Sequence, residues 1–351
     1  MTHFFMTQTN DGNMSKPPPS SDARFAQRLQ WARKVCGDPS LQLERASADA
    51  SARSYWRTIW QEPSALIMDS PPALEPLQQW LLMRDHLDRA GIRVPAVRHV
   101  DCEQGFALLE DLGPTTLLTV LSLETADVWF EAAIQQLIRL QSAPIPPGID
   151  RFDERQLARD ASLFYDWFLE RHLRLQLNRA EISALRNVQS LLTECVHQQA
   201  TVLVHRDFMP RNLIPLKDNS VAVIDFQDCM EGPIAYDPMS LFKDTGISWP
   251  LAAIARWLGS YYQSAQQRGL IRASLKQFLQ AADWMGIQRH MKVLGIFARL
   301  HHRDGKSLYL QEIPRMIAYL RDILPKYPEF AALQALIHSR VMPALARDHS
   351  Q

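Results

Sequence analysis

The 351-residue sequence has few cysteines, and none of them lies in a C-x-x-C pair or near a histidine at zinc-binding spacing. The four are Cys36, Cys102, Cys195 and Cys229. Their spacing argues against a disulfide framework or a structural zinc site and is typical of a reducing compartment. No apolar run approaches the roughly 18 residues of a membrane-spanning helix, and the N-terminus lacks the pattern of a secretory signal. We therefore expect a cytoplasmic protein that does not bind a membrane.

The sequence also lacks an excess of either charge. Lysine plus arginine and aspartate plus glutamate both number 38, so the formal net charge is zero. A general nucleic-acid binder usually carries a basic excess, so no nucleic-acid partner is expected. The sequence gives no indication of protein partners, and function must depend on a local site.

The length predicts two domains or lobes, and the composition is that of a globular protein. Residues 1–21, with three consecutive prolines, are expected to form a disordered tail. Residues 22–113 mix helices and strands, whereas residues 114–351 are mostly helical. Periodicity predicts helices at 22–36, 75–90, 126–141, 154–175, 180–199 and 250–267, further helices from 274 onward, and strands at 41–44, 54–60, 65–68, 106–109, 201–204, 213–216 and 221–224.

One segment of the helical part carries a chemical pattern. Residues 205–212 fit H-x-D-x-x-x-x-N, between one short strand and a predicted hairpin, and Asp225 follows the second hairpin strand. Phosphoryl transfer needs a group that positions the attacking hydroxyl and oxygen ligands that hold Mg²⁺ at the phosphates. Asp207 can provide the first, and Asn212 and Asp225 can provide the second. The hairpin should bring all three side chains into one cleft.

This segment resembles the catalytic core of the kinase-like phosphotransferases, which include aminoglycoside phosphotransferases, choline kinases and protein kinases. The resemblance implies an α+β, bilobal protein-kinase-like fold with a small sheet-containing N-lobe and a larger, mainly helical C-lobe. It implies ATP between the lobes, Asp207 as catalytic base, and Asn212 and Asp225 as Mg²⁺ ligands. The interlobe hinge would lie at residues 110–113, with Glu110 and Leu112 beside the adenine.

The acceptor is expected to be a small molecule, because only residues 226–236 separate Asp225 from the next predicted helix. That leaves little room for the peptide-docking segment of protein kinases. Several stretches resemble the anomeric N-acetylmuramate/N-acetylglucosamine kinases of cell-wall recycling, namely 49–57, 68–72, 109–113, 224–228 and 288–299. The resemblance implies transfer from ATP to the anomeric hydroxyl of the sugar, giving the 1-phosphate.

The sequence departs from the superfamily at the phosphate-binding strand, where residues 65–69 contain no lysine. We expect Arg53 or Arg57 to supply the missing charge, since arginine binds phosphate well, although both could be solvated strand residues. The preceding loop lacks glycine, but its small residues, including Ser51, could still offer backbone amides and a hydroxyl to a phosphate.

Acceptor contacts are predicted from position alone. Gln227 and Asp228 follow the metal-binding aspartate and could contact sugar hydroxyls or a second metal. Arg289 and Arg299, on a helix of the C-lobe, could meet the lactyl carboxylate of N-acetylmuramate, or could form a solvated face. The helical tryptophans should be core residues, with Trp284 the one to check as a sugar platform.

Three alternatives stay open. An aminoglycoside kinase would need a strongly acidic cleft, which the neutral charge and the arginines of the C-lobe disfavour. A choline or homoserine kinase would show an aromatic cage or a carboxylate clamp. A non-catalytic pseudokinase is supported by the missing strand lysine, but the base and both metal ligands are present.

Overall fold

The computed structural model describes residues 21–46, 52–59, 63–244 and 246–348. The disordered tail expected at 1–21 therefore lies outside the described residues, apart from Ser21, which begins helix α1. The chain divides into two compact units. We call the part up to Gln78 together with Ala96–Asp111 the sheet unit, and Gln79–Pro95 together with everything from Leu112 onward the helical unit.

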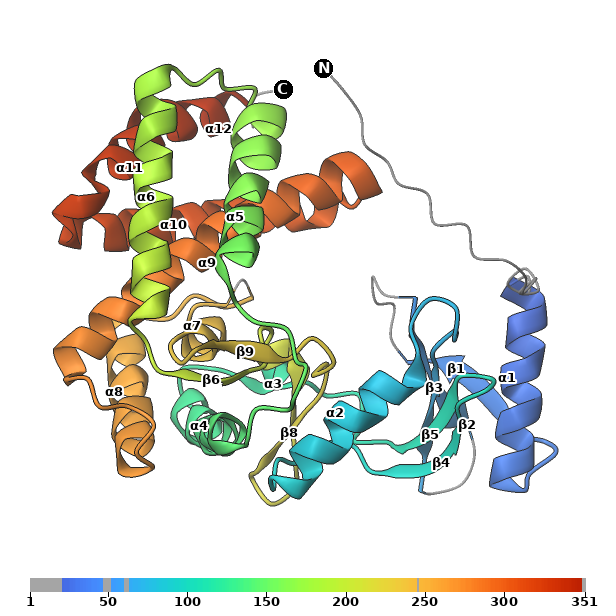
Figure 1. Ribbon diagram of the computed structural model, residues 1–351. Coiled ribbons are helices and arrows are strands. Elements are labelled where there is room, and N and C mark those ends of the chain that lie inside the picture. Colours follow the sequence, from blue (N-terminus) through green and yellow to red (C-terminus); the bar gives the residue numbers. More distant parts are fainter. Residues whose placement is uncertain (1–20, 47–51, 60–62, 245, 349–351) are drawn as a thin grey trace. The chain divides into compact units, whose positions relative to one another are not determined.

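The sheet unit contains one antiparallel sheet with a helix packed on it (Figure 1). Its elements are α1 (Ser21–Cys36), β1 (Gln42–Arg45), β2 (Ser54–Ile59), β3 (Ala65–Asp69), β4 (Val97–Asp101) and β5 (Phe106–Glu110). The strand order is β1-β2-β3-β5-β4, so β3 lies in the centre. Trp31 and Ala32 of α1 are buried in one cluster with Ile67, Phe106 and Leu108 of the sheet. Burial of this apolar surface holds α1 on the sheet.

Helix α2 (Leu77–Arg89) lies within the helical unit from Gln79 onward. The other elements of that unit begin with α3 (Leu117–Val120), α4 (Ala126–Ser142), α5 (Glu154–Ser162), the π-helix η1 (Leu163–His172), α6 (Arg179–His197), β6 (Thr201–Val204), the 3₁₀ turn η2 (Pro210–Asn212), β7 (Leu213–Pro215), β8 (Val221–Val223) and β9 (Met230–Pro233). They continue with α7 (Tyr236–Phe242), α8 (Leu251–Gln267), α9 (Leu275–Asp304), η3 (Ser307–Glu312), α10 (Ile313–Ile323), η4 (Leu324–Lys326), η5 (Pro328–Phe330), α11 (Ala331–Leu336), η6 (Ile337–Val341) and α12 (Met342–Asp348). Two short antiparallel sheets, β6 with β9 and β7 with β8, frame the predicted motif.

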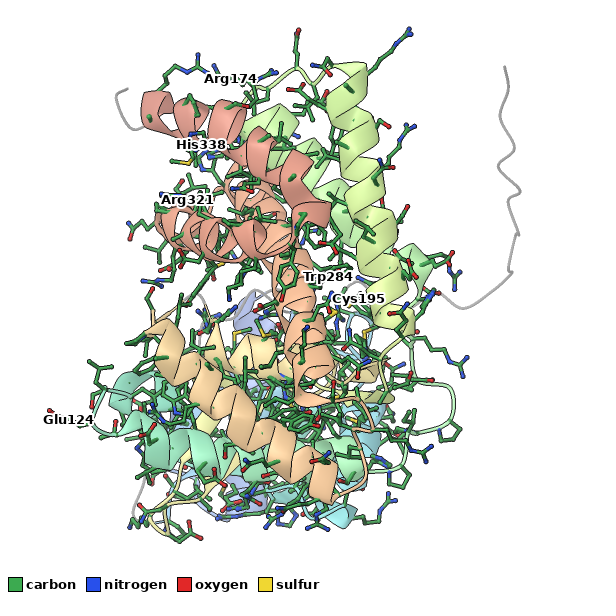
Figure 2. All side chains as sticks on the ribbon, turned by 90° about the vertical axis from the view of Figure 1, so that its left-hand side faces the viewer. Glu124, Arg174, Cys195, Trp284, Arg321 and His338 are labelled. Atoms are coloured by element: carbon green, nitrogen blue, oxygen red, sulfur yellow. The ribbon has the colours of Figure 1, made fainter. Side chains whose placement is uncertain are left out.

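Helix α9 is the central element of the helical unit, and several other helices of this unit pack against it (Figure 2). A capping box between Ser274 and Gln277 begins it, and Gly305, with a φ of 67°, ends it. Helix η1 packs closely along it: a Cβ atom at Gly295 would lie 2.3 Å from the carbonyl carbon and oxygen of Leu163. No helix of the described chain is long and apolar enough to cross a membrane.

The expected α+β class with a sheet-containing part and a mainly helical part is confirmed. One prediction was wrong in kind, because the helix expected at 154–175 is α-helical only to Ser162 and continues as a π-helix. Strands β4 and β9 and the short helix α3 were not predicted.

Candidate active site

The predicted motif forms one polar cluster in the helical unit. Strand β6 ends before His205, and the pairing of Leu213 with Val223 places Asn212 beside the residues that follow β8. Asn212 Nδ2 donates to the main-chain carbonyl of Asp207 at 2.9 Å and lies 3.3 Å from Asp225 Oδ2. The structure therefore brings together the three residues that the sequence singled out.

Asp237, at the start of α7, fixes the loop that carries Asp207. Its Oδ2 accepts the main-chain N–H of His205 at 2.7 Å, and its Oδ1 accepts that of Arg206 at 3.0 Å. The carboxyl is fully buried, and burial raises the pKa of Asp237 to about 6 against the opposing effect of His205 and the two N–H donors. Sequence reasoning missed this role, although the Asp-Pro pair at a helix start was the available signal.

Two residues of the cluster have left-handed backbone conformations that L-amino acids rarely adopt. Arg206 has a φ of 74° and Asp225 a φ of 64°. Each such residue costs on the order of 1–3 kcal/mol and persists only where neighbouring contacts hold it, which is common at functional sites. His205 connects the two segments, since its Nε2 lies 3.1 Å from the carbonyl oxygen of Ile224, the residue before Asp225.

Gln227 and Asp228 lie next to this cluster. Gln227 Nε2 donates to Asp225 Oδ1 at 2.7 Å, so this side chain holds the carboxylate of Asp225. Gln227 Oε1 is buried without a hydrogen-bond partner in the described chain. Asp228 is exposed.

The structure separates the two arginines predicted together as acceptor contacts. Arg289 and Arg299 are ten positions apart on α9, a rise of about 15 Å along the helix axis. Arg289 is only 5% exposed, and its Nη1 donates to the main-chain carbonyl of Arg206 at 3.1 Å and lies 3.3 Å from the Tyr236 hydroxyl. Arg299 is half-buried, and its Nε has no hydrogen-bond partner among the described residues.

Trp284 contributes to the core of the helical unit. Its ring meets Phe330 edge-on at 4.8 Å and Tyr327 at 6.0 Å between ring centroids. In Figure 2 it lies close to Cys195 of α6, with which it lines a hollow. These contacts show that Trp284 packs against core aromatic residues.

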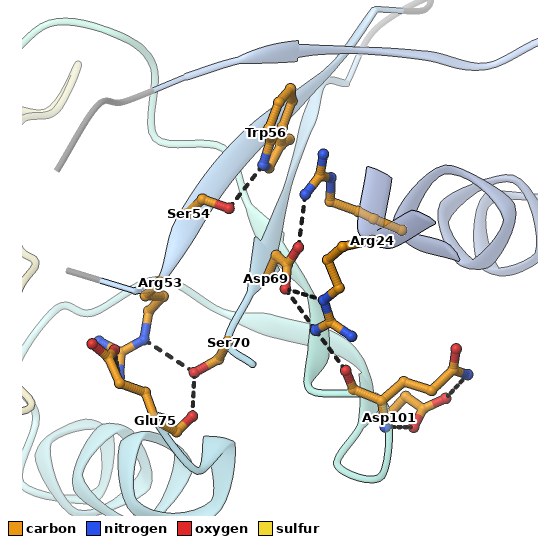
Figure 3. Close-up of polar contacts among 10 residues, drawn as sticks. Arg24, Arg53, Ser54, Trp56, Asp69, Ser70, Glu75 and Asp101 are labelled. Atoms are coloured by element: carbon orange, nitrogen blue, oxygen red, sulfur yellow. Dashed lines mark hydrogen bonds and ion pairs between the residues drawn. The ribbon is translucent and has the colours of Figure 1, made fainter. Parts of the chain in front are cut away.

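In the sheet unit, the predicted nucleotide residues are held by carboxylates. Ser51 lies outside the described residues. Arg53 is 7% exposed, and its Nη2 lies 3.1 Å from Glu75 Oε2, with Ser70 Oγ 3.4 Å from its Nε (Figure 3). Arg57 donates from Nε and Nη2 to the two carboxylate oxygens of Asp111, at 2.6 and 3.1 Å.

The remaining predicted nucleotide residues lie at and just after the end of β5. Glu110 ends β5, and its Oε2 accepts the main-chain N–H of Ala96 at 3.0 Å. Leu112 is half-buried. The last of the three boundaries between the two units falls between Asp111 and Leu112, within the segment 110–113 that was expected to be a hinge.

The strand without a lysine, β3, ends in a buried acidic residue instead. Asp69 is 2% exposed. Arg24 of α1 donates to its Oδ1 at 2.6 and 3.0 Å (Figure 3). Arg28 donates to its Oδ2 at 2.7 Å. The Arg28 guanidinium also lies 3.7 Å from the centroid of the Trp56 ring. Asp69 therefore ties α1 to the sheet.

Known proteins are similar to this chain over most of its length. The chain is 39% identical over 330 residues to an N-acetylmuramate/N-acetylglucosamine kinase of Pseudomonas putida, covering 91% of this chain and 97% of that one. It is 36% identical over 313 residues to a protein of the same name from Neisseria meningitidis, covering 88% and 93%.

Solved structures share the fold at low identity. A choline kinase from Streptococcus pneumoniae superimposes with a TM-score of 0.60 at 15% identity, covering 85% of this chain and 99% of that one. An ADP-bound aminoglycoside phosphotransferase gives a TM-score of 0.57 at 14% identity, covering 84% and 97%. Residues 42–275 match the phosphotransferase enzyme family, and the chain belongs to that family of hydroxyl-directed kinases.

Proposed function

We propose that the protein transfers the γ-phosphoryl group of ATP to the anomeric hydroxyl of N-acetylmuramate or N-acetylglucosamine, giving the sugar 1-phosphate. The observation that carries this proposal is the 36–39% identity, over about nine-tenths of the chain, to kinases named for these two sugars. Recycling of cell-wall sugars in the cytoplasm belongs to the same proposal.

The proposed role of Asp207 is to orient the attacking hydroxyl and accept its proton. Phosphoryl transfer depends mainly on positioning and charge, so the placement of this carboxylate is its main contribution. The loop geometry supports the role, because hydrogen bonds at His205 and Arg206 fix the chain just before Asp207. Asn212 Nδ2 holds its main-chain carbonyl.

Asn212 and Asp225 are the proposed ligands of Mg²⁺, which prefers oxygen donors and is usually bound by few protein groups together with phosphates. Gln227 orients one oxygen of Asp225. Because Asn212 Nδ2 is held by the Asp207 carbonyl, Asn212 Oδ1 is the atom that can turn toward an ion beside Asp225. The residues present therefore fit the ion, and bound magnesium would supply charge neutralisation at the phosphates.

On the acceptor side, we propose that Asp228 contacts sugar hydroxyls. It follows Gln227, whose amide is bound to Asp225, and it is exposed to solvent. This places a second carboxylate close in sequence to the proposed metal ligand, where a sugar hydroxyl would have to approach.

The test is an acceptor panel with Mg-ATP and N-acetylmuramate, N-acetylglucosamine, kanamycin, choline or homoserine, following ADP release and the product by phosphorus NMR. We expect a sugar 1-phosphate signal with the N-acetyl sugars. Asp207→Asn should fold normally and lose about 10²–10⁴-fold in kcat, the usual contribution of a general base.

Turnover of kanamycin, choline or homoserine alone would contradict the sugar acceptor and leave the kinase chemistry in place. Absence of turnover with all acceptors would favour a pseudokinase. Full activity in Asp207→Asn would overturn the role given to that residue.

A further inference from the structure

Helix α9 presents two buried cations, one turn apart, to a single tyrosine. Arg289 is 5% and Lys292 8% exposed. Lys292 Nζ lies 3.0 Å and Arg289 Nη1 3.3 Å from the hydroxyl oxygen of Tyr236, which is itself buried at the start of α7. A buried charge destabilises the fold unless it is hydrogen-bonded, so the role of these two cations needs an explanation.

The two cations differ in their other contacts: Lys292 Nζ lies 4.0 Å from Asp160 Oδ2, whereas Arg289 reaches the loop before Asp207. Arg289 Nη1 donates to the main-chain carbonyl of Arg206 at 3.1 Å, where Ser240 Oγ lies at 3.4 Å. The N–H of the same residue is held by Asp237 at 3.0 Å. The peptide groups on both sides of Arg206 are therefore fixed, and Arg206 is the residue with a φ of 74°.

We infer that Arg289 is a positioning residue, which holds Arg206 in its left-handed conformation so that the next residue, Asp207, is presented to the acceptor hydroxyl. The inference rests on the proposed function, because it assigns Asp207 the catalytic role. It replaces the expectation that Arg289 meets the carboxylate of the substrate. Its charge is directed into the protein, toward a carbonyl and a hydroxyl.

The left-handed conformation suggests a direct test, because glycine adopts a positive φ without steric cost. If Arg289 acts by holding Arg206 in this conformation, Arg206→Gly should lessen the need for Arg289. A double-mutant cycle measures this dependence and does not require that either single variant be fully active.

The cycle compares wild type, Arg289→Met, Arg206→Gly and the double variant, with circular dichroism and thermal unfolding to verify folding. Arg289→Met should lower kcat about 30-fold, with the KM values for ATP and sugar within about threefold. In the Arg206→Gly background the same replacement should cost less than about fivefold. Arg289→Lys, which keeps a donor on a shorter side chain, should regain part of kcat and provides a second variant if Arg289→Met does not fold.

Lys292→Met is the matched control, since it removes a buried cation from the same tyrosine and leaves the contact between Arg289 and Arg206 in place. Its effect on kcat should be the same in the wild-type and Arg206→Gly backgrounds. An equal loss for Arg289→Met in both backgrounds would overturn the inference, as would a loss confined to the KM for the sugar. An Asp207→Asn variant with full activity would instead overturn the proposed function.

Discussion

The buried arginines of the two units are bonded differently, whereas the buried lysines of the helical unit, Lys243 and Lys292, face carboxylates as the arginines of the sheet unit do. In the sheet unit the buried Arg28 is paired with Asp69 and the buried Arg53 with Glu75. The half-buried Arg24 and Arg57 are paired with Asp69 and Asp111. In the helical unit, Arg289 donates to a main-chain carbonyl and a tyrosine hydroxyl. A charge pair joins two side chains, whereas a cation bonded to a carbonyl fixes the conformation of the backbone. A buried arginine near a proposed active site is therefore not by itself evidence of an anion-binding site.

The largest expected effect on stability is at the sheet unit's buried pair. Asp69→Asn would leave the buried Arg28 and the half-buried Arg24 without a carboxylate, and breaking a buried pair in this way costs about 3–5 kcal/mol. We expect a loss of that order in the free energy of unfolding, measured by urea denaturation. Asp304→Asn, which removes a more exposed pair with Arg303 in the helical unit, is the control and should stay close to wild type. Equal losses in the two variants would contradict the distinction between buried and exposed pairs.

A second prediction concerns the pH dependence of stability and His290, a buried histidine of the helical unit. Burial lowers the pKa of His290 to about 3, and its ring stacks on Tyr319 at 4.8 Å. The unfolded chain takes up a proton at this imidazole below about pH 6.5, whereas the folded protein does so only near pH 3, so stability falls as pH falls through that interval. At pH 5 the loss amounts to about 2 kcal/mol.

His290→Phe keeps a ring against Tyr319 but cannot titrate. Between pH 7 and pH 5, the free energy of unfolding should therefore fall by about 2 kcal/mol less in this variant than in wild type. The difference between the two proteins should stay nearly constant between about pH 7 and pH 8. The same slope in both proteins between pH 7 and pH 5 would show that His290 is not the titrating group.

The smallest expected effect tests whether any arginine of the sheet unit serves the nucleotide. We propose Arg53, because it lies just before β2 and immediately after Ala52, whose N–H is itself bound by Glu75. Arg53→Ala should raise the KM for ATP about tenfold, equivalent to about 1.4 kcal/mol. Arg57→Ala should change it less than about threefold, since Asp111 holds its Nε and Nη2 donors at 2.6 and 3.1 Å, whereas the contacts of Arg53 with Glu75 and Ser70 are longer, at 3.1 and 3.4 Å. If neither variant changed the KM for ATP, the result would show that these two arginines have only a structural role.

Much of the fold was predictable because the strongest apolar patterns mark its elements. The strands at 54–59 and 65–69 and the helices at 126–142 and 179–197 lie within a few residues of the predicted ranges. Strand β4, by contrast, is largely polar and lies at a sheet edge, and β9 contains Gly232 and Pro233, so neither shows a clear alternating pattern. The π-helix was missed because a change of hydrogen-bond register leaves no mark on apolar spacing.

The site was predictable where its residues are close in sequence. Asp207, Asn212 and Asp225 are joined by one hairpin, so spacing alone suggested that they meet. The contact of Arg289 with Arg206 joins residues 83 positions apart and depends on how α9 packs, which no local pattern encodes. Asp237 is nearer in sequence, but its role depends on burial, which single-residue identity does not reveal.

The close approach at Gly295 has a consequence for how α9 can change in length. Arg289 is bonded to the carbonyl of Arg206 and, together with Lys292, to the Tyr236 hydroxyl, whereas Gly295, one turn after Lys292, fits against the backbone of Leu163. A single inserted or deleted residue between Lys292 and Gly295 would rotate one half of the helix by about 100° relative to the other. Either the loop contact or the tight packing would then be lost. The length of this stretch is therefore fixed by the contacts on both sides of it.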